Sequence, residues 1–157
     1  MIYAVKEVSV NRFREQSDPL LSRAQVWAGL LRKAHDGTRF IPAMTRCEVV
    51  AEEEGGLVRD VVIGGLPARE QVKFYPLRKA VYLRLSGPAD GIIVNEILEL
   101  ADGELKLRFS FALQLQDVDS GTDAERKLSA TLCEGYFSAV DTALAEIRRG
   151  VRAGRIG

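Results

Sequence analysis

The stretch Leu105-Lys-Leu-Arg-Phe-Ser-Phe-Ala-Leu-Gln-Leu115 alternates apolar and polar residues along almost its whole length. Successive side chains of a β-strand point to opposite faces, so this alternation predicts a long strand with one buried and one solvated face. The solvated face would carry Lys106, Arg108, Ser110 and Gln114. The buried face would carry Leu105, Leu107, Phe109, Phe111, Leu113 and Leu115.

A long amphipathic helix is predicted after this strand, over residues 124–149. Apolar side chains recur there at the spacing of one buried stripe, which comprises Leu128, Leu132, Tyr136, Val140, Leu144 and Ile147. A long sheet that curls over such a stripe tends to leave a hollow beside the helix. The two elements together therefore favour a cavity between sheet and helix.

The rest of the chain supplies the other strands of the sheet. A first strand is expected over 2–11, followed by a helix from the capping box Ser22-x-x-Gln25 to about Ala34 and a short helical turn over 38–41. From Met44 the period changes to two, with corners at glycine and proline. These corners separate strands near 44–54, 57–64, 67–76, 79–86, 91–101 and 104–117, the last two joined by a two-residue hairpin at Asp102-Gly103.

This order predicts an α+β helix-grip fold in one domain over residues 1–157. A curved antiparallel sheet of about seven strands would wrap around the long C-terminal helix, with a short helical pair after strand one. A chain of this length can bury a core without disulfides or metals.

Composition excludes several classes of function. The 22 basic and 22 acidic side chains cancel, which disfavours nucleic-acid binding. No signal-peptide pattern and no apolar run of about 20 residues is present, so we expect a cytoplasmic protein without membrane insertion. One histidine and two separated cysteines form no metal-ligand or nucleophile motif, and no glycine-rich phosphate loop occurs. We expect neither a metal nor another cofactor.

Three charged residues are predicted to face inward. Glu70 lies in phase with Val72 and Phe74, Glu96 lies in phase with Ile92 and Val94, and Arg59 accompanies Leu57 and Val61. A tight turn at 64–67 would set position 61 opposite 70, which makes Arg59 and Glu70 diagonal neighbours. An arginine beside a buried carboxylate is either a structural ion pair or part of a ligand site.

The N-terminal motif Leu21-Ser22-Arg23-x-Gln25-x-Trp27-x-Gly29-Leu30-x-x-Lys33-Ala34 is followed by Phe40-x-Pro42 and the Gly64-Gly65 hairpin. With these residues the chain resembles the AtaL-like group of the START and birch-pollen-allergen (SRPBCC) superfamily. The resemblance implies a ligand held between the sheet and the last helix. It also implies that cyclase or hydrolase activity has arisen within the superfamily.

The leading hypothesis is a carrier or sensor that binds an apolar or amphipathic small molecule between the sheet and the C-terminal helix. One alternative is a cyclase or dehydratase acting on a polyketide-like or aromatic substrate, with Glu70 or Glu96 as acid or base. Another is a protein-interaction module whose pocket is filled by its own side chains, and a homodimer is possible. The candidate pocket residues are Phe40, Arg59, Glu70, Phe74, Glu96, Phe109, Phe111 and Tyr136.

Overall fold

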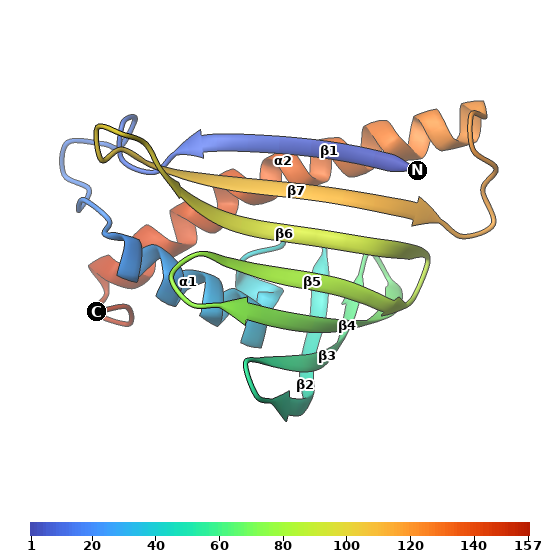
Figure 1. Cartoon of the computed structure of the whole chain (residues 1–157), viewed down its shortest axis with the longest axis horizontal. Coiled ribbons are helices and arrows are strands. Elements are labelled where there is room, and N and C mark those ends of the chain that lie inside the picture. Colours follow the sequence, from blue (N-terminus) through green and yellow to red (C-terminus); the bar gives the residue numbers. More distant parts are fainter.

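A computed structural model describes residues 1–157 and shows one seven-stranded antiparallel sheet with two helices against one face (Figure 1). The strand order is β1-β7-β6-β5-β4-β3-β2, so β1 and β2 form the two edges. The elements are β1 (Ile2–Ser9), α1 (Arg23–His35), the 3-10 turn η1 (Gly37–Arg39), β2 (Met44–Glu53), β3 (Gly56–Ile63), β4 (Leu66–Tyr75), β5 (Lys79–Ser86), β6 (Ala89–Glu99), β7 (Leu105–Leu115) and α2 (Asp123–Arg152). The α+β helix-grip prediction is confirmed.

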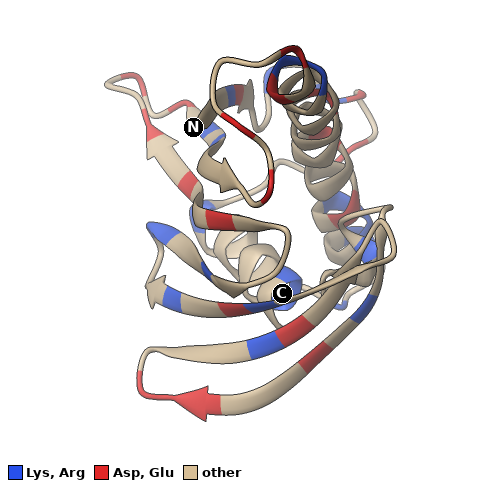
Figure 2. Cartoon of the chain, turned by 90° about the vertical axis from the view of Figure 1, so that its right-hand side faces the viewer, with Lys and Arg blue, Asp and Glu red and all other residues tan.

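The sheet curves around the helices, as the view turned by 90° shows (Figure 2). Acidic and basic residues are interspersed along the ribbon rather than gathered by sign. Neither helix is apolar enough over a sufficient length to cross a membrane.

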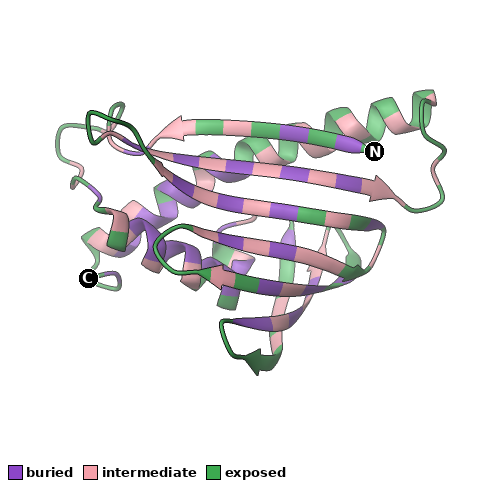
Figure 3. Cartoon of the chain, in the orientation of Figure 1, coloured by how far each residue is buried: buried purple, intermediate pink, exposed green.

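Strand β7 buries the apolar face that its alternation predicts, from Leu105 to Leu113, while Leu115 is half-buried. Helix α2 is different. Its predicted stripe is fully buried only from Val140 onward, and Leu128 near its start is 41% exposed. In Figure 3 the second half of α2 is largely buried and the first half is exposed or intermediate. The helix is therefore anchored to the core through residues 139–150.

Helix α1 begins at the predicted capping box, in which the Ser22 hydroxyl accepts from the Gln25 N–H and the Gln25 side chain accepts from the Ser22 N–H. Trp27 and Leu30 bury against the second half of α2, in a cluster that also holds Phe40. Gly29 lies at the helix crossing, where an added Cβ would meet Ile147 Cγ1 at 2.3 Å. The crossing needs a glycine because a side chain has no room there.

The inward face of β6 is the opposite of the predicted one. Ile93, Asn95 and Ile97 are buried, and Glu96 lies on the outer face beside Arg108 of β7. The turn explains the error. Three residues, 101–103, separate Leu100 from Glu104, whose backbones are hydrogen-bonded, so Asn95 rather than Glu96 faces Phe109. A one-residue change of register moves every side chain of a strand to the other face.

Candidate functional site

The concave face of the sheet holds a buried carboxylate, Glu70, between two arginines. Arg59 Nε donates to Glu70 Oε1 at 2.9 Å, and Arg84 Nε donates to Glu70 Oε2 at 2.7 Å. The three side chains are at most 8% exposed. Burial by itself would raise the pKa of the Glu70 carboxyl, but the two guanidinium groups outweigh burial and hold this pKa below its ordinary value. Glu70 is therefore an anion in the folded protein at neutral pH.

Strand register brings these three groups together. Arg59 of β3 is directly opposite Glu70 of β4, and Arg84 of β5 is opposite Glu70 on its other side. The sequence predicted that Arg59 lies diagonal to Glu70, whereas the two residues are direct cross-strand partners. The tight turn at Gly64-Gly65 pairs Ile63 with Leu66, which sets Ala68, rather than Glu70, opposite Val61.

Arg59 also ties the sheet to helix α1. Its Nη1 donates to the carbonyl oxygens of Lys33 and Ala34, both at 2.9 Å. The last carbonyls of a helix have no partner within the helix, so a guanidinium at this place satisfies them. The charged cluster thus fixes where the end of α1 lies over the sheet.

Lys33 projects from α1 into the same interior and is 4% exposed. Its Nζ donates to Asn95 Oδ1 at 2.8 Å and lies 4.8 Å from the centroid of the Tyr82 ring and 5.2 Å from that of Phe109. No carboxylate forms an ion pair with this amine. Burial, followed by the charge of Arg59, lowers the pKa of Lys33 to about 7. A large fraction of the amine is consequently neutral near physiological pH.

Two polar atoms beside Lys33 are buried without a hydrogen-bond partner, the Tyr82 hydroxyl and Asn95 Nδ2. Leaving such a group unpaired in a protein interior is destabilising by about 1–3 kcal/mol. Burial also raises the pKa of Tyr82, so its hydroxyl stays protonated and able to donate. The cluster therefore retains unused donors in an apolar setting.

Apolar side chains surround this polar cluster. Phe111 is buried on β7, with its ring centroid 4.3 Å from that of the half-buried Tyr136 on α2, and burial raises the Tyr136 pKa. Phe109 contacts the Lys33 amine, as described above. Phe74 is half-buried on β4, edge-on to Trp27 at 6.2 Å. Phe40 lies in the helix–helix core instead, and Glu96 lies outside the cluster altogether.

The sequence pattern did not predict four residues of this site, Lys33, Tyr82, Arg84 and Asn95. The burial of Lys33 could have been predicted, because it continues the buried α1 positions Val26 and Leu30 at helical spacing. The pattern of β5 is misleading for Tyr82 and Arg84. Its outer face carries the apolar residues Val81, Leu83 and Leu85, which would be expected to point inward. The convex side of β5 and β6 is apolar as well, with Val81 opposite Val94 and Leu83 opposite Ile92. Alternation alone therefore does not predict which face of β5 or β6 points toward the core.

Neither of two open pockets at the surface is lined by the interior cluster, which comprises Lys33, Arg59, Glu70, Tyr82, Arg84 and Asn95. One, of about 540 Å³, lies on β2, β3, β4 and β5 and is lined by residues that include Arg46, Asp60 and Arg69. The other, of about 640 Å³, lies between the loop after β1 and the second half of α2. No three His, Cys, Asp or Glu side chains gather as a metal site would require.

The arrangement can hold a polar atom of a ligand within an apolar wall. Arg84, Lys33 and the Tyr82 hydroxyl are donors, and the neutral form of Lys33 is a base of near-neutral pKa. Glu70 is already engaged by two guanidinium groups, so it is a poor proton carrier.

Comparisons with known proteins agree on the fold. The family model described as acetylaranotin biosynthesis cluster protein L, AtaL, matches residues 8–154. No curated protein matches the chain. Among solved structures, the Zhui aromatase/cyclase from Streptomyces sp. R1128 is 19% identical with a TM-score of 0.71, covering 97% of this chain and 96% of that one.

Two further structures represent other branches with the same fold. A START superfamily protein from Mycobacterium smegmatis is 15% identical, with a TM-score of 0.65 over 94% of this chain and 99% of that one. Ara h 8.0201 is 18% identical, with a TM-score of 0.56 over 92% of this chain and 99% of that one.

Proposed function

Because the chain belongs to the AtaL family, within the START-like helix-grip fold, we propose that it binds an apolar or amphipathic small molecule between the sheet and the first half of α2. The observation that carries the proposal is a set of buried polar groups that lack partners, beside the Glu70 ion pairs and bordered by apolar side chains. Tyr82, Asn95 and Lys33 stand side by side in the interior, two with unpaired atoms and one without a counter-ion.

The first half of α2 packs loosely on the sheet, which supports the same location for the ligand. Leu132, Cys133 and Tyr136 contact the buried cluster of the sheet yet are themselves only half-buried. Strand residues beneath them, including Val72, Tyr82 and Phe111, are at most 2% exposed. A ligand that enters here would separate the first half of α2 from the sheet without disturbing the anchored second half.

A neutral apolar dye, N-phenyl-1-naphthylamine, tests the site through its fluorescence on binding. We expect the folded protein to bind it, and Leu132→Asp to weaken binding by at least about tenfold, because a carboxylate would then face the apolar wall. Thr131→Asp is the matched control, since it adds the same group on the exposed face of the same turn and should leave the affinity unchanged.

Native mass spectrometry of the purified protein provides a second readout, through any small molecule that co-purifies. Absence of both a co-purified molecule and dye binding would contradict the proposal. It would favour the alternative of an interaction module with a filled pocket.

A second candidate function is cyclisation or dehydration of a polyketide-like substrate. It is favoured by the likeness to the Zhui aromatase/cyclase and by the near-neutral pKa of Lys33. In this role the neutral Lys33 amine would take a proton from carbon next to a carbonyl, with Arg84 or Tyr82 stabilising the oxyanion. Lys33→Met would then abolish turnover of such a substrate while dye binding persists.

A further inference from the structure

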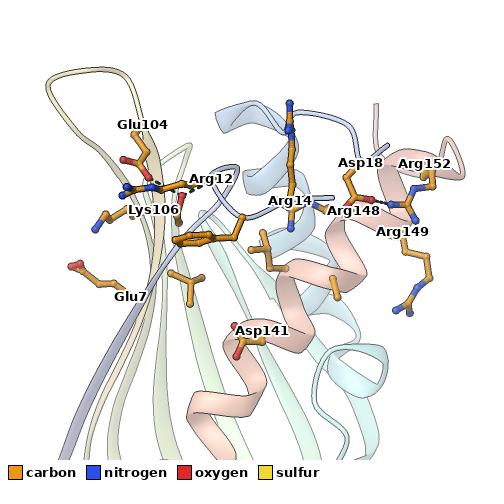
Figure 4. Close-up of a pocket in the computed structure, with 15 residues that line it drawn as sticks. Glu7, Arg12, Arg14, Asp18, Glu104, Lys106, Asp141, Arg148, Arg149 and Arg152 are labelled. Atoms are coloured by element: carbon orange, nitrogen blue, oxygen red, sulfur yellow. Dashed lines mark hydrogen bonds and ion pairs between the residues drawn. The ribbon is translucent and has the colours of Figure 1, made fainter. Parts of the chain in front are cut away.

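A second site lies at the opposite end of α2 from the proposed ligand site. Its pocket of about 640 Å³ opens between the loop after β1, the adjoining ends of β1 and β7, and the second half of α2 (Figure 4). This volume is in the range of small-molecule sites, about 300–1,000 Å³. The pocket shares no residue with the interior cluster around Glu70, so it is independent of the proposed function.

The pocket is lined by more cations than anions. Of its four carboxylates, Asp18 is paired with Arg152 and Asp141 with Lys6, Glu104 accepts from the Ser9 hydroxyl, and Glu7 forms no ion pair. The basic residues of the lining are Arg12, Arg14, Lys106, Arg148, Arg149 and Arg152. Four of these six, Arg12, Arg14, Lys106 and Arg148, have no carboxylate partner.

Two arginines without a carboxylate partner line the pocket from different elements. Arg14 comes from the loop after β1 and Arg148 from α2 (Figure 4). The Nε atom of each is buried without a hydrogen-bond partner, although Arg148 Nη2 donates to the Val10 carbonyl. Burial and the charge of Arg14 lower the pKa of Arg148. Two like charges close enough to act on one another are stabilised by an anion that binds both.

We propose that Arg14 and Arg148 bind the phosphate group of a soluble small molecule in this pocket. Guanidinium groups match phosphate oxygens with two parallel hydrogen bonds, which a single ammonium group does not offer. The lining also includes the half-buried Val8 and the buried Leu144, and Phe13 stands beside them with 84% of its surface exposed. An apolar or aromatic body attached to the phosphate would cover Phe13, which otherwise faces solvent.

Phenyl phosphate has both parts of this chemistry and is the probe for isothermal titration at low salt. We expect it to bind more tightly than inorganic phosphate, and its affinity to fall as sodium chloride is added. Arg14→Gln and Arg148→Gln should each weaken binding by at least about tenfold, the effect of losing a charge-assisted hydrogen bond. Arg126→Gln removes the same charge from an exposed position on α2 and serves as control.

Arg148 also holds the β1 end through Val10, so its variant is checked for folding by circular dichroism, whereas Arg14 makes no such contact. Unchanged affinity in Arg14→Gln would overturn the proposal, as would absence of phenyl phosphate binding at millimolar concentration. Phosphatidic acid vesicles test a lipid headgroup as the source of the phosphate. Cosedimentation with those vesicles, without a response to phenyl phosphate, would likewise overturn it. Loss of dye binding by Leu132→Asp has no bearing on this result.

Discussion

Glu70 balances the charge of two interior arginines, and its removal leaves both uncompensated. In Glu70→Gln the shape is kept but Arg59 and Arg84 lose their anion. We expect the free energy of unfolding to fall by about 3 kcal/mol, as when one partner of a buried ion pair is removed. Urea unfolding followed by circular dichroism measures it.

Glu96→Gln is the matched control for this change, because Glu96 pairs with Arg108 on the outer face, where the side chains are 23% and 36% exposed. The expected loss there is below about 1 kcal/mol. Equal losses in the two variants would contradict the contrast between the concave and convex faces.

Lys33 makes the free energy of unfolding depend on pH in a predictable direction. The folded pKa is about 7 and the ordinary value is 10.5, so between these values the unfolded chain binds more protons than the folded one. The free energy of unfolding then rises with pH above about 7, by up to about 1.4 kcal/mol per pH unit for this group. Below pH 7 both states are protonated and the contribution is flat.

Lys33→Met isolates this term, since the Arg59 contact is to the Lys33 backbone and survives the substitution. We expect wild type to gain stability relative to Lys33→Met as pH increases from 7 to 9, measured by urea unfolding at each pH. Parallel stability profiles of the two proteins would show that the amine is not buried as the structure places it.

At the scale of elements, the crossing of α1 and α2 depends on Gly29. Alanine normally stabilises a helix relative to glycine by up to about 1 kcal/mol. Here its Cβ would meet Ile147, which is fully buried and has little freedom to move. We expect Gly29→Ala to reduce the free energy of unfolding by about 1–3 kcal/mol, the usual effect of overpacking.

The double variant Gly29→Ala/Ile147→Ala tests whether the clash is the cause. Alanine at position 147 removes Cγ1, Cδ1 and Cγ2, the three atoms that the new Cβ would meet. The loss of stability in the double variant should therefore be smaller than the sum of the two single losses, although Ile147→Ala by itself destabilises by about 2–5 kcal/mol. Simple additivity in thermal or urea unfolding would place the cause of the Gly29 effect elsewhere.

The elements differ in how far sequence predicts them. Strand bounds come within about two residues wherever polar and apolar residues alternate strictly, as in β7. Alternation predicts the wrong inward face for β6 and none for β5, because both faces of each strand carry apolar side chains. There the turn decides, and the three-residue loop before Glu104 rather than a two-residue hairpin moved Glu96 out and Asn95 in.

The candidate site was predictable only in part, for the same reason. Arg59 and Glu70 stand out because each interrupts an apolar inward face on β3 or β4. Lys33 and Arg84 reach the cluster from α1 and β5, and no short-range pattern reports which helix lies over which strand. The position of α1 over the sheet therefore determines which residues complete the site, and local sequence patterns do not report that position.

For the molecule as a whole, α2 consists of an anchored half and a loosely held half. Residues 139–150 bury against the core shared with α1, whereas no residue of 123–138 is fully buried. Amide groups exchange with solvent through local openings, whose free energy is low where few apolar contacts are lost. We expect amides of 123–138 to exchange at least about tenfold faster than those of 139–150 in hydrogen-exchange mass spectrometry.

Ligand binding should change the exchange rates of the two halves of α2 differently. A molecule held under the first half of α2 adds contacts that opening must break, so N-phenyl-1-naphthylamine should slow exchange of 123–138 and leave 139–150 unchanged. Phenyl phosphate should instead slow exchange in the loop 10–18, since its pocket is built from that loop and the anchored half. Uniform protection along α2 without either ligand would contradict the division of the helix and, with it, the proposed entry route to the interior cluster.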